Sequence, residues 1–383
     1  MLPMRPMKMG GEYLIFGENS LKYLSELEGY KAIIVHDGNF LKESGYYHEI
    51  ESYLIKAGFE IDEFSGIESD PSFDTVMKGA NQMKKFEPDW IIAVGGGSVM
   101  DAAKAMWIYY EHPEMTELNQ LVKPIPKLRE KARMCCIPTS SGTGSEVSRS
   151  VVISDTVTHK KNGVGDMEMM PDIAILEPKL TVSLPKSITA ATGMDALTHS
   201  IEARVSSRAN MVADALADKA IIEIYNNILT AYHEPKNIEA REKMLVSATI
   251  SGIAFTNVSL GIVHSLSHPI GGEFNVPHGL SNAIILPYVI EYNSKDEKTK
   301  QIYNDIALML DEEKSLVEII HDLNRKLEIP KTLQEFIKDD HKFEERLEEL
   351  SKNALADGCT KTNPIIPTLS EFEELYRKCY YGE

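Results

Sequence analysis

Histidines and one aspartate gather in two short windows of the sequence, with a spacing that suits metal binding. Asp195 and His199 are four residues apart in GMDALTH, and His264 and His268 repeat this spacing in HSLSH. On an α-helix, residues four apart lie one turn apart on the same face, as two ligands of one ion require. His278 follows in VPHG, where proline and glycine predict a turn after the helix.

These five side chains are difficult to explain as core residues. Taken singly, each histidine is more often a packed or capping residue than a ligand. Together, four histidines and a carboxylate in an otherwise apolar region need polar partners, because burying a polar group without a hydrogen bond costs free energy. A metal ion supplies such a partner. A carboxylate combined with neutral imidazoles suits either Fe²⁺ or Zn²⁺.

Two segments rich in glycine and hydroxyl groups predict a nucleotide site. The first follows the apolar run WIIAV and consists of Gly95, Gly96, Gly97 and Ser98. Its glycines allow close approach to a pyrophosphate, which the N-terminus of the following helix also attracts. The second follows RMCCI and includes Thr139, Ser140 and Thr143. Each segment alone suits a polar turn equally well, but two such loops after strands favour a nucleotide.

After these two segments, a third feature that could contact a cofactor is Asp37, which comes directly after the apolar run KAIIVH. A carboxylate at this place can accept a hydrogen bond from a ribose 2′-hydroxyl and would repel a 2′-phosphate, which favours NAD over NADP. The alternative is that Asp37 and the glycine after it only form a turn, for which both residues are equally suited.

The pattern of apolar residues divides the chain into two halves. Up to about residue 176, short apolar runs alternate with helical periodicity, which predicts βαβ units and a mostly parallel sheet. Beyond Pro185 nearly all periodicity is helical. We therefore expect an α/β dinucleotide-binding domain over residues 1–183 and an all-helical, metal-binding catalytic domain over residues 184–383. A length of 383 residues agrees with two domains.

Composition limits the classes of partner. A net charge of −18 argues against binding to nucleic acid or to an anionic membrane surface. No segment approaches the roughly 18 consecutive apolar residues of a membrane helix, and the N-terminal residues lack the features of a signal peptide. The four cysteines show no paired spacing and are expected to be free thiols. We expect a cytoplasmic protein without nucleic-acid or membrane partners.

Four longer motifs, in this order, resemble those of the iron-containing (group III) alcohol dehydrogenases: GGGSVMDAAK, PTSSGTGSEV, GMDALTHSIEA and HSLSHPIGGEFNVPHG. The resemblance covers essentially the full chain and is closest to the butanol and 1,2-propanediol dehydrogenase branch. It implies a dehydroquinate synthase-like fold and a homodimer. It also implies hydride transfer between a small alcohol or aldehyde and a nicotinamide cofactor, with the metal polarising the substrate oxygen.

The resemblance also assigns individual residues. The implied metal ligands are Asp195, His199, His264 and His278. His268 is then the histidine that does not bind metal, lies beside nicotinamide and substrate, and handles the proton. The implied cofactor contacts are Gly96, Gly97, Ser98, Asp101, Thr139, Thr143, Lys161 and Leu180. Asp37 matches the residue that discriminates against NADP in this family.

Two departures from the branch concern the expected pocket wall. Arg149 is unusual near a pocket for small apolar alcohols, and the segment CTKTNPI stands where the branch usually reads CTGxNPR. Alternatives to an alcohol dehydrogenase of this branch are a glycerol dehydrogenase, a dehydroquinate-synthase-like lyase on the same fold, and a non-catalytic metal- or nucleotide-binding protein. The two four-residue spacings favour a dehydrogenase, and a binding protein has no need of His268.

Overall fold

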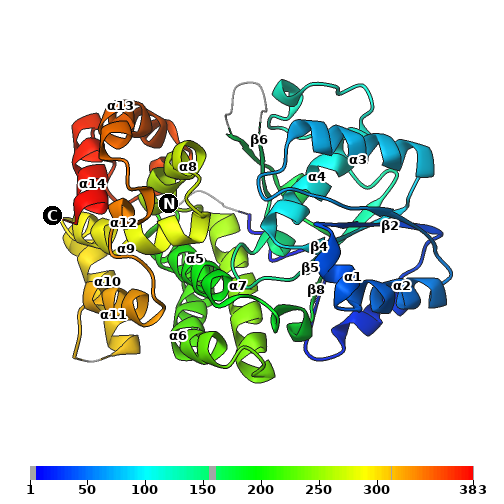
Figure 1. Ribbon diagram of the computed structural model, residues 1–383, viewed down its shortest axis with the longest axis horizontal. Coiled ribbons are helices and arrows are strands. Elements are labelled where there is room, and N and C mark those ends of the chain that lie inside the picture. Colours follow the sequence, from blue (N-terminus) through cyan, green and yellow to red (C-terminus); the bar gives the residue numbers. More distant parts are fainter. Residues whose placement is uncertain (1–5, 155–160, 312, 383) are drawn as a thin grey trace. The chain divides into compact units, whose positions relative to one another are not determined.

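The computed structural model describes residues 6–154, 161–311 and 313–382, with the side chains of Asn39 and Lys161 outside this description. The chain divides into two compact units, Met1–Ser183 and Leu184–Glu383. Each unit is described by itself below, and Figure 1 labels their helices and strands.

A parallel sheet forms the centre of the first unit. Within the described residues it has six strands in the order β1-β8-β5-β4-β2-β3, and all its neighbours pair in parallel, which confirms the expected parallel sheet. The strands are β1 (Tyr13–Phe16), β2 (Lys31–His36), β3 (Glu60–Phe64), β4 (Trp90–Gly95), β5 (Arg133–Pro138) and β8 (Ile173–Leu176). The antiparallel pair β6 (Ser150–Ser154) and β7 (Lys161–Gly165) forms a separate small sheet.

Helices cover both faces of this sheet (Figure 1). They are α1 (Asn39–Glu43), α2 (Tyr46–Lys56), α3 (Phe73–Phe86) and α4 (Gly97–Glu111). Successive residues of the central strands belong to different cores: Ile91 and Ala93 of β4 pack with α3 and α4, whereas Ile92 and Val94 pack with α2. A strand buried on both faces is apolar along its whole length, which is why β4 reads as the unbroken run WIIAV.

The second unit is helical throughout its described residues, as expected. Its helices are α5 (Lys186–Val205), α6 (Met211–His233), α7 (Ile238–Val258), α8 (Ile262–Phe274), α9 (His278–Asn293), α10 (Glu297–Leu310), α11 (Leu316–Lys326), α12 (Leu333–Ile337), α13 (Asp340–Ala356) and α14 (Leu369–Tyr381). No single helix in the described part of the chain is long and apolar enough to cross a membrane; by length and composition, only α7 and α8 together would qualify, and they are bent by 104°.

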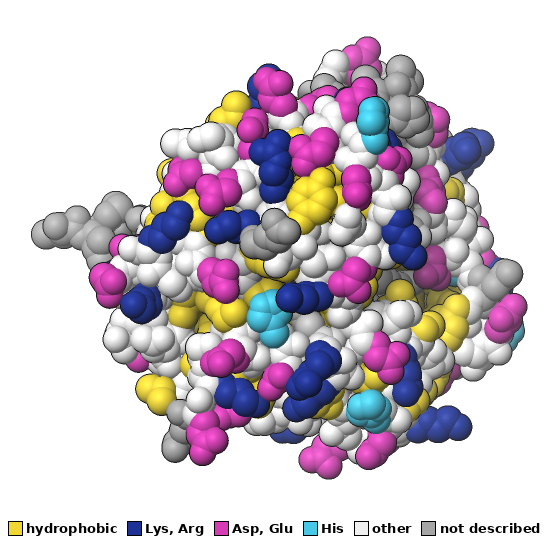
Figure 2. Space-filling model, turned by 60° about the vertical axis from the view of Figure 1, so that its left-hand side comes forward, with side chains coloured by type: hydrophobic (Ala, Val, Ile, Leu, Met, Phe, Trp, Pro, Cys, Tyr) yellow, Lys and Arg dark blue, Asp and Glu magenta, His cyan; other side chains and the backbone are white. Residues whose placement is uncertain are grey.

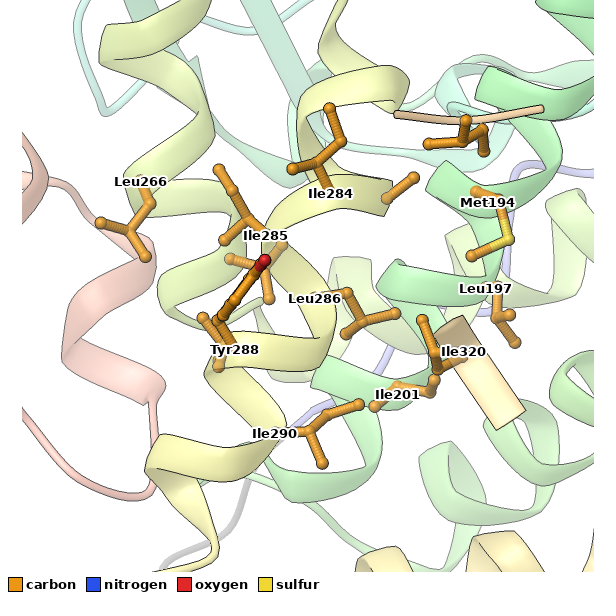
Figure 3. Packing of buried hydrophobic residues seen from close by; sticks show 14 of the residues in the cluster. Met194, Leu197, Ile201, Leu266, Ile284, Ile285, Leu286, Tyr288, Ile290 and Ile320 are labelled. Carbon is orange, nitrogen blue, oxygen red and sulfur yellow. The ribbon is translucent and has the colours of Figure 1, made fainter. Parts of the chain in front are cut away.

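The core of the second unit is built around α5 and α9. In Figure 3, Leu286 and Ile290 of α9 lie close to Ile201 of α5 and Ile320 of α11. All four side chains are buried, and burying each contributes roughly 1.5–3 kcal/mol to stability. This packing fixes α5 so firmly that a second face of the same helix can carry polar side chains in a defined geometry.

The charged surface residues and the cysteines are distributed as the sequence leads one to expect. On the face shown in Figure 2, Lys and Arg side chains are scattered among Asp and Glu side chains. The cysteines are free, with Cys135, Cys136 and Cys379 buried and Cys359 partly exposed, as their spacing predicted.

Candidate metal centre and nucleotide loops

Three helices of the second unit bring the predicted metal ligands together. Asp195 and His199 lie one turn apart on α5, and His264 lies in the first turn of α8. The sequence predicted a turn at His278. In the structure, His278 is instead the first residue of α9. Pro277, which directly precedes it, has a φ of −55° that suits the start of a helix.

The carboxylate of Asp195 is the centre of this group. Its Oδ1 lies 3.6 Å from Nε2 of His199 and 3.7 Å from Nε2 of both His264 and His278. One ligand atom from each of the four residues lies within 4.8 Å of the others. Asp195 and His264 are almost completely buried, whereas 41% of the His278 side chain is exposed.

The charges of the group depend on one another. Burial alone would raise the pKa of Asp195, but the imidazoles of His199, His278 and His264 hold it well below its usual value. Burial likewise opposes protonation of His264, yet Glu202 and Asp195 raise the pKa of this imidazole to about 9. Asp195 is therefore an anion whose negative charge attracts a cation to the surrounding nitrogens.

Sequence reasoning missed two residues that contact the ligands. Oε2 of Glu202 lies 2.5 Å from Nδ1 of His264. The amide nitrogen of Asn282 donates to Oδ1 of Asp195 at 2.7 Å and lies 3.1 Å from Nε2 of both His264 and His278. A helical signal existed for both, because Glu202 follows His199 by three residues and Asn282 follows His278 by four.

His268 lies beside the ligand group without being part of it. Its ring stacks on that of His278, with centroids 5.4 Å apart and planes at 12°, and 38% of its side chain is exposed. Its Nδ1 lies 2.8 Å from Oδ2 of Asp357. Burial would raise the pKa of Asp357, but His268 and, to a smaller extent, the N–H of Cys359 overcome this effect and lower it to about 2. Asp357 was not recognised from the sequence.

In the first unit, the predicted nucleotide loops lie side by side. Strands β5, β4 and β2 are neighbours in the sheet, so the loops after all three emerge at the same edge. The N–H of Thr139 donates to the carbonyl of Gly95 at 3.0 Å. A Cβ on Gly97 would lie only 2.8 Å from Cγ2 of Thr143, which explains why a glycine is needed there.

Two charged residues of α4 hold the second loop in place. The carboxylate of Asp101 accepts hydrogen bonds from Oγ of Ser145 at 2.8 Å and from the N–H of Val152 at 2.9 Å. Nζ of Lys104, which is fully buried, donates to the carbonyls of Ser145 at 2.7 Å and Ser148 at 3.1 Å. Asp101 thus has a structural role in the loop, and its direct contact with a cofactor stays a prediction.

The remaining residues predicted to contact the cofactor have different surroundings. Asp37 is exposed directly after β2, and Ser98 donates to the carbonyl of Ser69. Oγ of Ser140 lies 3.6 Å from the place of a Cβ on Gly96. Leu180 is fully buried in the core beside β8. Lys161 begins β7, but its side chain lies outside the described residues. Their contacts with a cofactor stay predictions.

Comparison with known proteins decides the family. Residues 12–178 match the model described as iron-containing alcohol dehydrogenase, and residues 189–380 match the model of the C-terminal part of the Fe-containing alcohol dehydrogenase family. An NADPH-dependent butanol dehydrogenase of Clostridium saccharobutylicum is 42% identical over 377 residues, which are 96% of each protein. The chain belongs to the iron-containing alcohol dehydrogenase family.

A solved structure of this family confirms the fold. The iron-containing alcohol dehydrogenase of Thermococcus thioreducens is 34% identical, with a TM-score of 0.91 over 99% of this chain and 100% of that one. The bifunctional aldehyde-alcohol dehydrogenase AdhE of Escherichia coli K12 is 37% identical over 93% of this chain, which spans only 44% of AdhE. The predicted reaction class is confirmed: the chain is a metal-dependent alcohol dehydrogenase.

The donor set in the second unit fits the iron that names the family. Neighbouring ligands on a tetrahedral ion with bonds of about 2.1 Å are roughly 3.4 Å apart. The three Asp195–histidine distances of 3.6–3.7 Å need only small shifts to reach this value. One anionic oxygen and three imidazole nitrogens also match the chemistry of Fe²⁺ or Zn²⁺.

Proposed function

We propose that this dehydrogenase transfers hydride between a small, mainly primary alcohol or its aldehyde and a nicotinamide cofactor, using Fe²⁺ held by Asp195, His199, His264 and His278. Zn²⁺ could occupy the same donors. The observation that carries the proposal is the convergence of these four side chains, with ligand atoms within 4.8 Å of one another. When bound, the ion would supply Lewis acidity that polarises the substrate oxygen.

His268 is the residue that we propose handles the substrate proton. Its ring lies against His278 and is partly exposed, so that it has access to both the metal centre and solvent. Asp357 accepts a hydrogen bond from the N–H at Nδ1 of His268, which leaves Nε2 to take up and release the proton of the hydroxyl group. Imidazole suits this task because its unperturbed pKa lies near neutral pH.

In the first unit, we propose that the loops after β4 and β5 bind the pyrophosphate of the cofactor and that Asp37 favours NAD over NADP. The exposed carboxylate at the end of β2 would accept a hydrogen bond from a ribose hydroxyl and repel a phosphate in its place. The butanol dehydrogenase of C. saccharobutylicum is named as NADPH-dependent. The proposal therefore predicts that this chain differs from that relative in cofactor choice.

The test of cofactor choice is kcat/KM for NADH and NADPH with butanal. Removing the charge in Asp37→Asn should raise the NADPH-to-NADH ratio by about tenfold, since one repulsive contact contributes roughly 1.4 kcal/mol. Asp37→Gly should raise it further by making room for the phosphate. Glu60→Gln, which removes an exposed charge elsewhere on the neighbouring strand β3, is the control and should leave the ratio unchanged. An unchanged ratio in both Asp37 variants would contradict the assignment.

The test of the metal assignment is removal and return of the ion. We expect a chelator to abolish aldehyde-dependent oxidation of the reduced cofactor, and Fe²⁺ or Zn²⁺ to restore it, because the ion polarises the substrate oxygen. A panel of aldehydes and alcohols that includes butanol and glycerol defines the substrate class. Full turnover by protein shown to be metal-free would refute the proposal.

We also propose that the protein is a cytoplasmic homodimer. The edge strand β1 supports association, because 55% of Tyr13 and 60% of Phe16 are exposed and proteins usually cover an apolar edge strand. Free thiols support a reducing compartment. Sedimentation of the protein gives the mass that tests the dimer.

A further inference from the structure

Glu202 connects two of the helices that carry metal ligands. It belongs to α5, and only 4% of its side chain is exposed. Its Oε2 lies 2.5 Å from Nδ1 of His264, and its Oε1 accepts the N–H of Val263 at 2.7 Å. A Cβ on Gly261 would lie 2.9 Å from Oε1, so the glycine leaves room for the carboxylate. Both oxygens of Glu202 thus contact the first turn of α8.

The position of Glu202 determines which nitrogen of His264 can bind a cation. A metal ion binds only the neutral imidazole, so one proton of His264 must leave when the ion binds. The neutral ring keeps one proton, and its other nitrogen has a free lone pair. A carboxylate accepts hydrogen bonds but does not donate them, so Glu202 keeps the proton of His264 on Nδ1. The lone pair is then on Nε2, the atom that lies 3.7 Å from Oδ1 of Asp195.

We propose that Glu202 is a positioning residue that holds His264 in the tautomer and orientation needed for metal binding. The inference rests on the proposed function, because it takes His264 as a ligand. Carboxylates that accept the second N–H of a metal-bound histidine fix the ring and raise its basicity, and losing one typically reduces metal affinity 10–100-fold.

The competing explanation is that Glu202 only caps a helix. The N-terminus of α8 is buried, and its N–H groups are satisfied by side chains from distant parts of the chain: Glu202 binds Val263, and Oδ1 of Asn363 accepts the N–H of Ile262 at 3.2 Å. Glutamine separates the two explanations. Its amide oxygen can still accept the N–H of Val263, but its NH₂ group then faces His264 and moves the imidazole proton to Nε2, where it blocks metal binding.

The experiment compares Glu202→Gln with unchanged protein by competition with a chromogenic chelator for Zn²⁺ and by the absorption spectrum of the Co²⁺-substituted protein. We expect a 10–100-fold loss of Zn²⁺ affinity and an altered Co²⁺ spectrum in protein that remains folded by circular dichroism. The matched control is Glu111→Gln in the first unit, which removes a buried carboxylate that accepts the N–H groups of Lys131 and Ala132. This control should keep its Zn²⁺ affinity within about twofold.

If Glu202→Gln does not fold, Glu202→Asp replaces it in the same assays, and the shorter carboxylate should again weaken Zn²⁺ binding. Unchanged Zn²⁺ affinity in the folded variant would show that Glu202 is only a cap and overturn the inference. His264→Ala shows whether a negative result concerns the proposed metal ligands or only the role of Glu202. If it retains Zn²⁺ affinity, the ligand assignment in the proposed function is wrong. If it loses Zn²⁺ while Glu202→Gln does not, only the role of Glu202 is wrong.

Discussion

The two units prepare for binding in different ways. In the first, the candidate cofactor site consists of backbone and small side chains. Charged residues such as Lys104 and Asp101 form hydrogen bonds that hold one loop to a helix. In the second, charged and imidazole side chains are themselves the proposed binding groups. The first site therefore depends on shape and the second on the chemistry of a few atoms, so substitutions should affect them differently.

The largest effect is expected in the metal centre. His264→Ala should lose the metal and at least about 10³-fold in kcat/KM, because the ion contributes several kcal/mol to stabilising the transition state. Metal content by atomic absorption and aldehyde reduction measure the two losses. His268→Ala is the matched control on the same helix: it should keep the metal and slow turnover. If His268→Ala loses the metal and His264→Ala keeps it, the two histidines have exchanged roles.

A large loss of stability is expected from the residue that fixes the second loop. Lys104→Met should lower the free energy of unfolding by about 3 kcal/mol, because it leaves the carbonyls of Ser145 and Ser148 and the carboxylate of Asp101 without their buried cation. Urea unfolding measures this loss, and Zn²⁺ affinity should not change. Lys56→Met, at an exposed position in α2, should change stability by less than about 0.5 kcal/mol.

A smaller and more local effect is expected where the two loops touch. Gly97→Ala should raise KM for the cofactor by about tenfold, since the added methyl group displaces Thr143 and overpacking costs roughly 1–3 kcal/mol. Thr143→Ser removes the methyl group that lies closest, so the double variant should recover part of the affinity. No recovery would mean that the glycine is needed for reasons other than this contact.

The smallest effect is expected in an ion pair that joins α8 to α13. Burial would raise the pKa of Glu273, but Lys342 and Arg346 lower it. A lowered carboxyl pKa adds stability above the unfolded value of 4.5 that is lost as the pH falls below it. Glu273→Gln should therefore cost about 0.5–1 kcal/mol at pH 7 and almost nothing near pH 3, as measured by thermal unfolding. An equal cost at both pH values would rule out the electrostatic origin.

The sequence was sufficient to predict candidate site residues where they follow the spacing of a single helix or strand. The pairs Asp195–His199 and His264–His268 could be placed on helix faces because residues four apart share a face, and the strand-to-glycine transitions indicated the loops after β4 and β5. Glu202 was within reach of the same argument. Three short strands, β1, β6 and β7, were not predicted. The pairing of β1 with β8 joins segments far apart in the sequence, such as Tyr13 and Ile173, so no local pattern reveals it.

The rest depends on contacts between distant segments. Asp357 is 89 residues from His268, and Asn363 is 101 residues from Ile262, so no local pattern links either pair. The sequence showed CTKTNPI only as a departure from related proteins near an expected pocket wall. In the structure, Thr360 and Asn363 of this segment support the helix that carries His264, and the place of the segment in a pocket wall stays a prediction.

The support of α8 by Thr360 and Thr362, which lie about 100 residues later in the sequence, has a consequence for protein synthesis. Oγ1 of Thr360 donates to Oγ of Ser265, and Oγ1 of Thr362 donates to the carbonyl of Leu260. The helix therefore lacks these partners until residues near 363 have left the ribosome, long after all four metal ligands have been translated. Since domains generally fold from the N-terminus during synthesis, the nucleotide-binding unit can form first, and the proposed metal site is expected to be fully supported only after the segment around Thr362 has been synthesised.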